Sequence, residues 1–106
     1  MRVIPGFCRA GGLELYEKAR MIVERSIDRG YVDDATVEML QSYTAKLLEL
    51  LCSIVSKFDH MPLTEAAALY ERSWLERNAV NPQLLDAVTR YALFIFTREM
   101  EETGVN

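Results

Sequence analysis

Apolar side chains recur at helical spacing along most of the chain, and the pattern is clearest between residues 33 and 58. When residues 37–58 are placed at about 100° per residue, nearly all large apolar side chains fall on one arc. That arc is about 200° wide, roughly twice the width that a helix needs to lie on one neighbour. We therefore predict a long helix that is covered from at least two sides.

The same spacing predicts three more helices, over residues 13–29, 64–77 and 82–102. The last of them again has an apolar arc of about 180–200°. No segment alternates between apolar and polar residues as a strand does, and no internal repeat or low-complexity stretch occurs. The sequence predicts an all-α protein, a four-helix antiparallel bundle-like domain over residues 13–106 with a long central second helix. An irregular N-terminal arm is expected over residues 1–12.

Residues at the ends of the predicted helices are typical of caps. Gly30 follows the first helix, where a left-handed residue often ends one. Either Asp33 or Asp34 is expected to cap the second helix, and Thr64 the third. Asn81, which precedes a proline at the first helical position, is the strongest local signal in the chain.

The order of a medium helix, a long central helix and a shorter third helix over residues 13–77 resembles the order of a histone fold. The resemblance rests on helix lengths, and it implies a dimer in which the long helices cross in a handshake. Histone loops carry arginines that approach DNA, whereas the corresponding loops here carry Asp33, Asp34 and Asp59. A histone-like helix order with an extra C-terminal helix is therefore the alternative fold, without support for DNA wrapping.

The composition is typical of a globular domain, since 50% of the 106 residues are hydrophobic and 26% are charged. A net charge of −4 gives no general attraction to phosphate backbones. No apolar run approaches the roughly 18–20 residues that span a bilayer, and the first residues lack the apolar segment of a secretory signal. We expect a cytoplasmic protein in which Cys8 and Cys52 are reduced, because two cysteines do not make a disulfide framework. A bridge between Cys8 and Cys52 is the alternative.

No residue pattern predicts catalysis, and no metal or cofactor site is expected. His60 is the only histidine, and the chain has no paired Cys-x-x-Cys, His-Glu-x-x-His or glycine-rich nucleotide loop. Cys8 lies beside Arg9 but has no histidine nearby that could serve as a base. We therefore predict that the protein is not an enzyme.

The wide apolar arcs of the second and fourth helices predict self-association. A second helix of about 26 residues would extend to roughly 39 Å, beyond the reach of the shorter third helix. Part of its apolar flank is expected to project, to be covered in a homodimer or larger assembly. In the alternative, the arm and Trp74 cover this flank within one chain. The side chains predicted at the dimer interface are Tyr43, Leu50, Ile54, Leu93 and Phe96.

Large apolar residues on otherwise polar faces indicate a second surface. Met39 and Phe94 are such residues, and Phe94 lies between Arg90 and Arg98 on the predicted helix. An aromatic side chain rimmed by charges is a frequent hot-spot arrangement in protein interfaces. The predicted partner-binding residues are therefore Phe94, Arg90, Arg98 and Met39. The alternative is that Phe94 packs under the N-terminal arm.

The predicted function is a non-catalytic helical protein–protein interaction module, an adaptor or regulatory protein, that self-associates by burying an apolar helix face. A small DNA-binding regulator is the alternative, because the arm carries Arg2 and Arg9 with no acid before Glu14. The acidic surface disfavours nucleic acid as a partner, and no membrane contact is expected.

Overall fold

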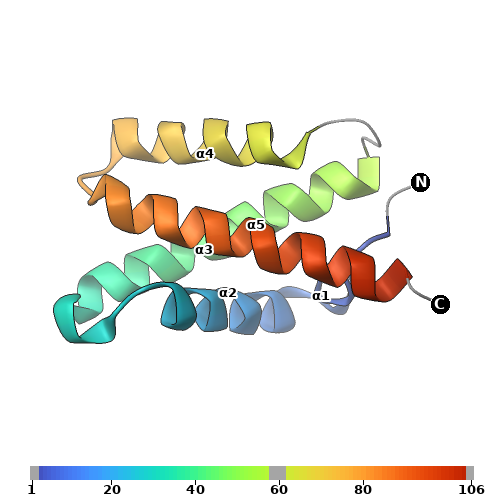
Figure 1. The fold of residues 1–106 in the computed structure, drawn as a ribbon, viewed down its shortest axis with the longest axis horizontal. Coiled ribbons are helices and arrows are strands. Elements are labelled where there is room, and N and C mark those ends of the chain that lie inside the picture. The colour runs from blue at the N-terminus through green and yellow to red at the C-terminus, as the bar shows by residue number, and fades with distance from the viewer. Residues whose placement is uncertain (1–2, 58–61, 105–106) are drawn as a thin grey trace.

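The computed structural model describes residues 3–57 and 62–104, most of which lie in helices (Figure 1). None of the described residues forms a strand, so the prediction of an all-α protein is confirmed. A 3₁₀ turn, η1 (Arg29–Tyr31), follows the second helix. The α-helices are α1 (Gly6–Ala10), α2 (Gly12–Ser26), α3 (Asp34–Lys57), α4 (Leu63–Arg77) and α5 (Pro82–Gly104).

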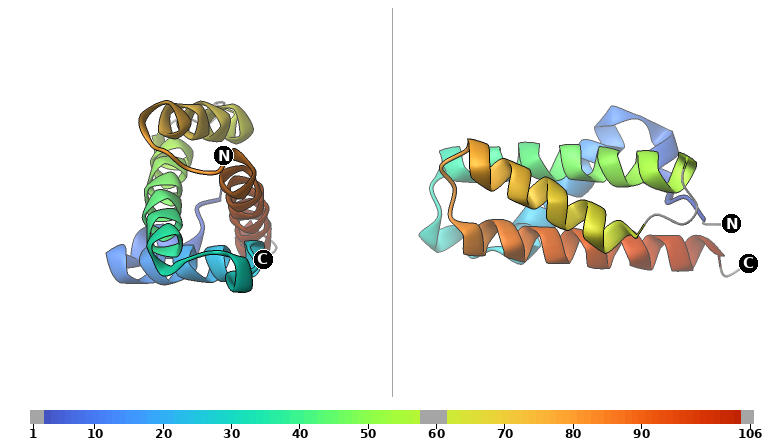
Figure 2. Two further views of the ribbon diagram at one scale, coloured as in Figure 1. Left: turned by 90° about the vertical axis from the view of Figure 1, so that its left-hand side faces the viewer. Right: turned by 90° about the horizontal axis from the view of Figure 1, so that it is seen from above.

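The two longest helices, α3 and α5, form the centre of the molecule. Seen along the long axis, α2 and α4 lie on opposite sides, with α3 and α5 between them (Figure 2). Successive long helices run in opposite directions, so α3 and α5 point the same way (Figure 1). The longest dimension of the molecule, 41 Å, is close to the roughly 36 Å length of a 24-residue helix. Both central helices therefore run nearly from one end to the other.

Side-chain caps begin the two central helices, as the sequence predicts. The carboxylate of Asp33 accepts a hydrogen bond from the backbone N–H of Thr36, with Oδ1 and N 2.8 Å apart. The side-chain and backbone hydrogen bonds of Thr36 also lower the pKa of Asp33. The side-chain oxygen of Asn81 accepts from the N–H of Gln83 at 2.8 Å, at the start of α5. Both caps satisfy helix N–H groups that have no partner within the helix.

The predicted end of the first helix at residue 29 and the left-handed cap at Gly30 are wrong. Helix α2 ends at Ser26, and Ile27 is already extended. The carboxylate of Asp28 accepts from the N–H of Gly30 at 3.0 Å, which favours the local turn η1 over another helical turn. Among the described residues, the backbone takes a positive φ only at Gly11, between α1 and α2.

The predicted cap of the third helix by Thr64 is also wrong. Helix α4 begins one residue earlier, at Leu63, and no side chain caps it. Pro62 is extended and its carbonyl accepts from the N–H of Ala66 at 3.2 Å, so the helix starts directly behind the proline. The proline therefore sets this boundary, and Thr64 lies inside the first turn.

The N-terminal arm is not irregular throughout, because it contains the short helix α1. Phe7 on α1 is only 4% exposed, and its ring meets the ring of Phe96 edge-on with centroids 5.7 Å apart. The backbone φ of 98° at Gly11 lets the chain turn sharply from α1 into α2, a conformation that other residues rarely adopt. The arm therefore closes the core at the end where α3 and α5 finish.

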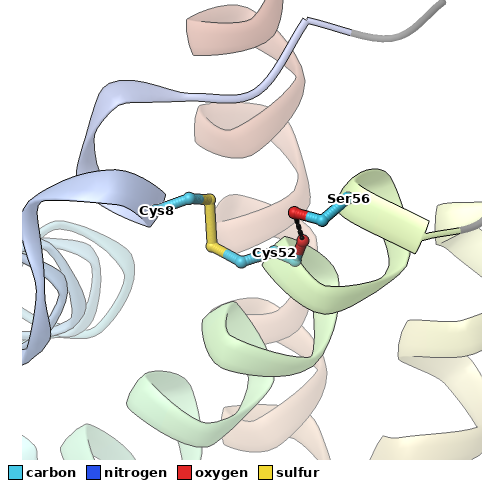
Figure 3. Close-up of a disulfide and its surroundings, with 3 residues drawn as sticks. All are labelled: Cys8, Cys52 and Ser56. Carbon is cyan, nitrogen blue, oxygen red and sulfur yellow. Dashed lines mark hydrogen bonds between the residues drawn. A yellow bond between two sulfur atoms is a disulfide. The ribbon is translucent and has the colours of Figure 1, made fainter.

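A disulfide joins this arm to the long helix, so the prediction that the two cysteines are reduced is wrong. Cys8 of α1 and Cys52 of α3 are bonded, with their Cα atoms 5.6 Å apart (Figure 3). Ser56, one turn further along α3, donates a hydrogen bond from its hydroxyl to the carbonyl of Cys52 at 2.8 Å. The two cysteines are 44 residues apart, and only the folding of the arm back over α3 brings them together.

We predict that removing the disulfide lowers the free energy of unfolding by about 2–4 kcal/mol, since a cross-link across 44 residues restricts the unfolded chain. The variant Cys8→Ala/Cys52→Ala and the wild-type protein treated with dithiothreitol should lose similar stability in urea unfolding. Dithiothreitol should not affect the double variant. Thiol titration of the denatured, unreduced wild type should find no free thiol, and two free thiols would refute the bond.

Candidate functional site

The outer face of α5 holds the clearest surface feature that the sequence predicts. A shallow, open depression of about 550 Å³ lies between side chains of this one helix, and we call it the α5 groove. Phe94 is 56% exposed and lies within it. The side chains that line the α5 groove are Arg90, Leu93, Phe94, Thr97, Arg98 and Glu101.

Helical geometry explains why Phe94 is exposed. Ala92 and Phe96, two residues to either side, are fully buried in the core, so Phe94 lies on the opposite face of the helix. The ring of Tyr91, one turn earlier, lies 6.0 Å from the ring of Phe94 between centroids. The alternative in which Phe94 packs under the arm is therefore wrong, because the arm places Phe7 against Phe96 instead.

Charged side chains border Phe94 on both sides along the helix. Arg90 pairs with Asp86 one turn earlier, with Nε and Oδ2 2.9 Å apart. Both side chains are largely exposed, so this pair contributes little to stability and leaves the guanidinium within reach of another carboxylate. Arg98 lines the α5 groove and also a second depression, of about 350 Å³, between α2 and α5.

The structure brings together three of the four predicted partner-binding residues. Phe94, Arg90 and Arg98 all line the α5 groove. Met39 is half-buried on α3 and is not part of the groove lining. Sequence periodicity places Met39 on a polar face, but it carries no information on which neighbouring helix that face meets.

The predicted dimer interface is largely the interior of a single chain. Tyr43 and Phe96 are completely buried and Ile54 is 4% exposed, so these three cannot meet a second intact copy. The wide apolar arcs that suggested the interface are covered by α2, α4 and the arm. Leu50 and Leu93 are half-buried, and Leu93 reaches the surface at the α5 groove. These two residues stay predictions.

A buried cluster of aromatic and hydroxyl side chains lies between α3, α4 and α5. Tyr43 and Thr89 are hydrogen-bonded at 2.6 Å, and the hydroxyl of Thr89 donates to the carbonyl of Leu85 at 2.7 Å. Because that bond uses the one proton of Thr89, the hydroxyl of Tyr43 is the donor to Thr89. Burial raises the pKa of Tyr43, which keeps the phenol protonated.

Two aromatic side chains of α4 complete this cluster. The ring of Tyr70 stacks on Tyr43 with centroids 5.3 Å apart, and Trp74 meets Tyr43 edge-on at 5.1 Å. The indole N–H of Trp74 donates to the hydroxyl of Tyr70 at 3.0 Å. Helical spacing places all three on apolar faces, but nothing in the sequence indicates that they meet. Such edge-on and offset pairs add to the packing of α4 on α3.

Glu71 connects the buried cluster to the surface. Partial burial raises the pKa of Glu71, and the negative charge of Asp86 adds to that rise. Glu71 and Asp86 also line a depression of about 280 Å³ between α4 and α5. Asp86 therefore faces Glu71 on one side and holds Arg90 of the α5 groove on the other.

The described residues offer no arrangement typical of a metal centre. No three histidine, cysteine, aspartate or glutamate side chains within residues 3–57 and 62–104 could together hold an ion. Asp59 and His60 lie outside the described residues. None of the helices in the described part of the chain is long and apolar enough to cross a bilayer.

The surface around the arm bears on the DNA-binding alternative. Arg9 is exposed on α1, whereas Arg2 lies outside the described residues. A depression of about 640 Å³ beside α1 is lined by Glu14, Glu17 and Glu99, together with one cation, Lys18, which pairs with Glu99 at 2.6 Å. Three carboxylates here disfavour the approach of a phosphate backbone.

Comparisons of the chain with protein-family models, with curated proteins and with solved structures found no match.

We predict that Glu71→Gln removes a pH dependence of stability. Because the folded state holds the Glu71 proton more tightly than the unfolded state, wild-type stability should fall as pH rises above the ordinary value of 4.5 through the raised pKa. The amide does not titrate, so the variant should lose this decline and be at least as stable as wild type at neutral pH. Urea unfolding between about pH 4 and pH 8 measures it.

Glu76→Gln is the matched control, because it neutralises an exposed carboxylate on the same helix. It should keep the wild-type slope of stability against pH. A Glu71→Gln variant with the wild-type slope would contradict the view that burial controls this carboxyl.

Proposed function

We propose that this protein is a non-catalytic helical interaction module that self-associates through the outer face of α5. The observation that supports the proposal is Phe94, an aromatic side chain 56% exposed in the middle of the α5 groove. Charged and polar side chains surround it on the same helix. Binding hot spots are enriched in this arrangement, because the apolar centre is desolvated on binding and the polar rim excludes water.

Other exposed apolar residues give weaker support for a binding surface. Leu13 and Tyr16 on α2, Tyr31 in η1 and Leu69 on α4 are also exposed. None of them is among the lining residues of the depressions described above. Single exposed apolar residues on convex surfaces are normal in proteins. The α5 groove differs because the aromatic ring, the half-buried Leu93 and the charged rim occur together.

The surface proposed for self-association differs from the one that the sequence predicts. The sequence placed it on the apolar arcs of the second and fourth helices, which the folded chain covers internally. A histone-like handshake needs an open apolar face on the long helix, and the large apolar side chains of α3 are buried or half-buried. The outer face of α5 therefore replaces the inner arcs as the proposed surface.

The disulfide bears on the compartment in which such a module works. Structural disulfides form and persist in oxidising compartments and are rare in the cytosol. The Cys8–Cys52 bond therefore favours an oxidising compartment over the cytoplasmic location that the sequence predicts.

We predict that Phe94→Ala raises the dissociation constant of the self-associated form by about tenfold or more, because it removes the aromatic centre of the surface. The side chain is exposed, so at protein concentrations where both are monomeric, thermal unfolding of the variant should match the wild type. Sedimentation equilibrium over a wide range of protein concentrations measures the association.

Leu69→Ala is the matched control, because it truncates a side chain that is 65% exposed on α4. It should leave the dissociation constant unchanged. A wild-type protein that stays monomeric at every concentration would refute the proposal, and so would equal weakening by the two variants.

A further inference from the structure

The α5 groove carries a pattern of side chains that is complementary to itself. Arg90, Phe94, Thr97 and Glu101 follow one another at intervals of four, three and four residues. These intervals keep the four side chains in one stripe along a helix. The stripe has a positive charge at one end, a negative charge at the other, and an aromatic ring and a threonine between them.

The intervals between the four residues are the same from either end of the stripe. The stripe can therefore be matched residue by residue with an antiparallel copy of the same helix. When two such stripes meet antiparallel, Arg90 of each copy lies opposite the partner's Glu101, and Phe94 lies opposite the partner's Thr97. Leu93 and Arg98 lie on opposite flanks of this stripe and do not face each other across the contact. The four residues of the stripe are therefore paired within their own set.

We propose that the occupant of the α5 groove is a second copy of this chain, antiparallel to the first, with a two-fold axis that passes between the two α5 helices at the level of residues 95 and 96. This inference rests on the self-association proposed above and adds the partner orientation and register. A contact of this kind uses the same patch on both subunits, as in most symmetric dimers.

Each pair has a physical reason to form. Arg90 and the partner's Glu101 make an ion pair that symmetry repeats, and the pairing of Arg90 with Asp86 is too exposed to prevent it. The Phe94 ring lies against the methyl group of the partner's Thr97.

Charge disfavours the neighbouring arrangements. A two-fold axis through Phe94 would place Arg90 opposite the partner's Arg98, and symmetry would repeat the repulsion. A parallel pair in register would place Arg90 against Arg90 and Glu101 against Glu101. Like charges that face each other across an interface cost free energy, so both arrangements are disfavoured.

The size of the contact sets the expected strength. The stripe extends over about 17 Å of one helix, or three turns. A contact along three turns of one helix from each copy buries less surface area than the roughly 1,200–2,000 Å² of a stable interface. We therefore expect a reversible dimer whose population rises with protein concentration.

Charge reversal at the two ends of the stripe tests this register. Arg90→Glu places two acidic side chains opposite each other, and Glu101→Arg places two basic ones, so each variant alone should have a dissociation constant raised about tenfold or more. An equimolar mixture of the two variants should dimerise about as well as wild type, because an acidic side chain then faces a basic one at both ends of the mixed contact. The double variant Arg90→Glu/Glu101→Arg should also recover, with both pairs reversed.

Two control variants make the same charge changes elsewhere on the surface. Arg20→Glu on α2 and Glu76→Arg on α4 alter exposed residues and should leave the dissociation constant at the wild-type value. Circular dichroism of every variant shows that it is folded. Rescue on mixing cannot arise from loss of stability, since neither variant changes in the mixture.

The outcomes separate the register from the proposed function. If Phe94→Ala weakens association but the two charge variants do not recover on mixing, this register is wrong and self-association through α5 stands. If neither single charge variant weakens the dimer, the register is wrong as well. If the wild type is monomeric at every concentration, both the register and the proposed function are refuted.

Discussion

The fold depends on the need to cover two long helices whose apolar faces are each wider than one neighbour can bury. Helices α3 and α5 run from the same end of the molecule to the other and cross at an angle (Figure 1). Helix α2 covers one side of this pair and α4 the opposite side (Figure 2). At the contact with α4, the buried ring of Tyr43 meets both Tyr70 and Trp74. Helices of the same chain therefore cover the wide apolar faces of α3 and α5 that the sequence pattern predicts.

The N-terminal arm covers the core at the end of the molecule where α3 and α5 finish. Helix α1 has five residues, too few to be stable as an isolated helix in water, so its tertiary contacts must hold it in place. Phe7 supplies apolar contact against Phe96, and the bond from Cys8 to Cys52 supplies a covalent link. The two act on adjacent residues of the arm, so the disulfide also keeps Phe7 close to its site when the arm loosens.

Features that depend on local sequence could be predicted, and features that depend on what lies across the core could not. Helical spacing and the side-chain caps at Asp33 and Asn81 depend on neighbouring residues, and both are correct. Spacing also shows that Phe94 lies opposite the apolar arc. It does not show which element covers an apolar arc, so Tyr43 was assigned to a dimer interface although it lies in the core. The disulfide was only an alternative to reduced cysteines for the same reason, because residues 44 apart meet only through the path of the arm.

The two faces of α5 are therefore under different physical requirements. Buried residues such as Val88 and Phe96 hold the inner face against the core, and truncating them would leave cavities. Folding makes no comparable demand on the outer face, where a polar residue in place of Phe94 would leave the core contacts unchanged. In the proposed dimer, the aromatic ring supplies most of the attraction. The opposite charges of Arg90 and Glu101 choose the orientation, which is the usual division between apolar and charged groups in an interface. Folding of a single chain uses neither the exposed ring nor the order of these charges, but antiparallel pairing of two chains uses both.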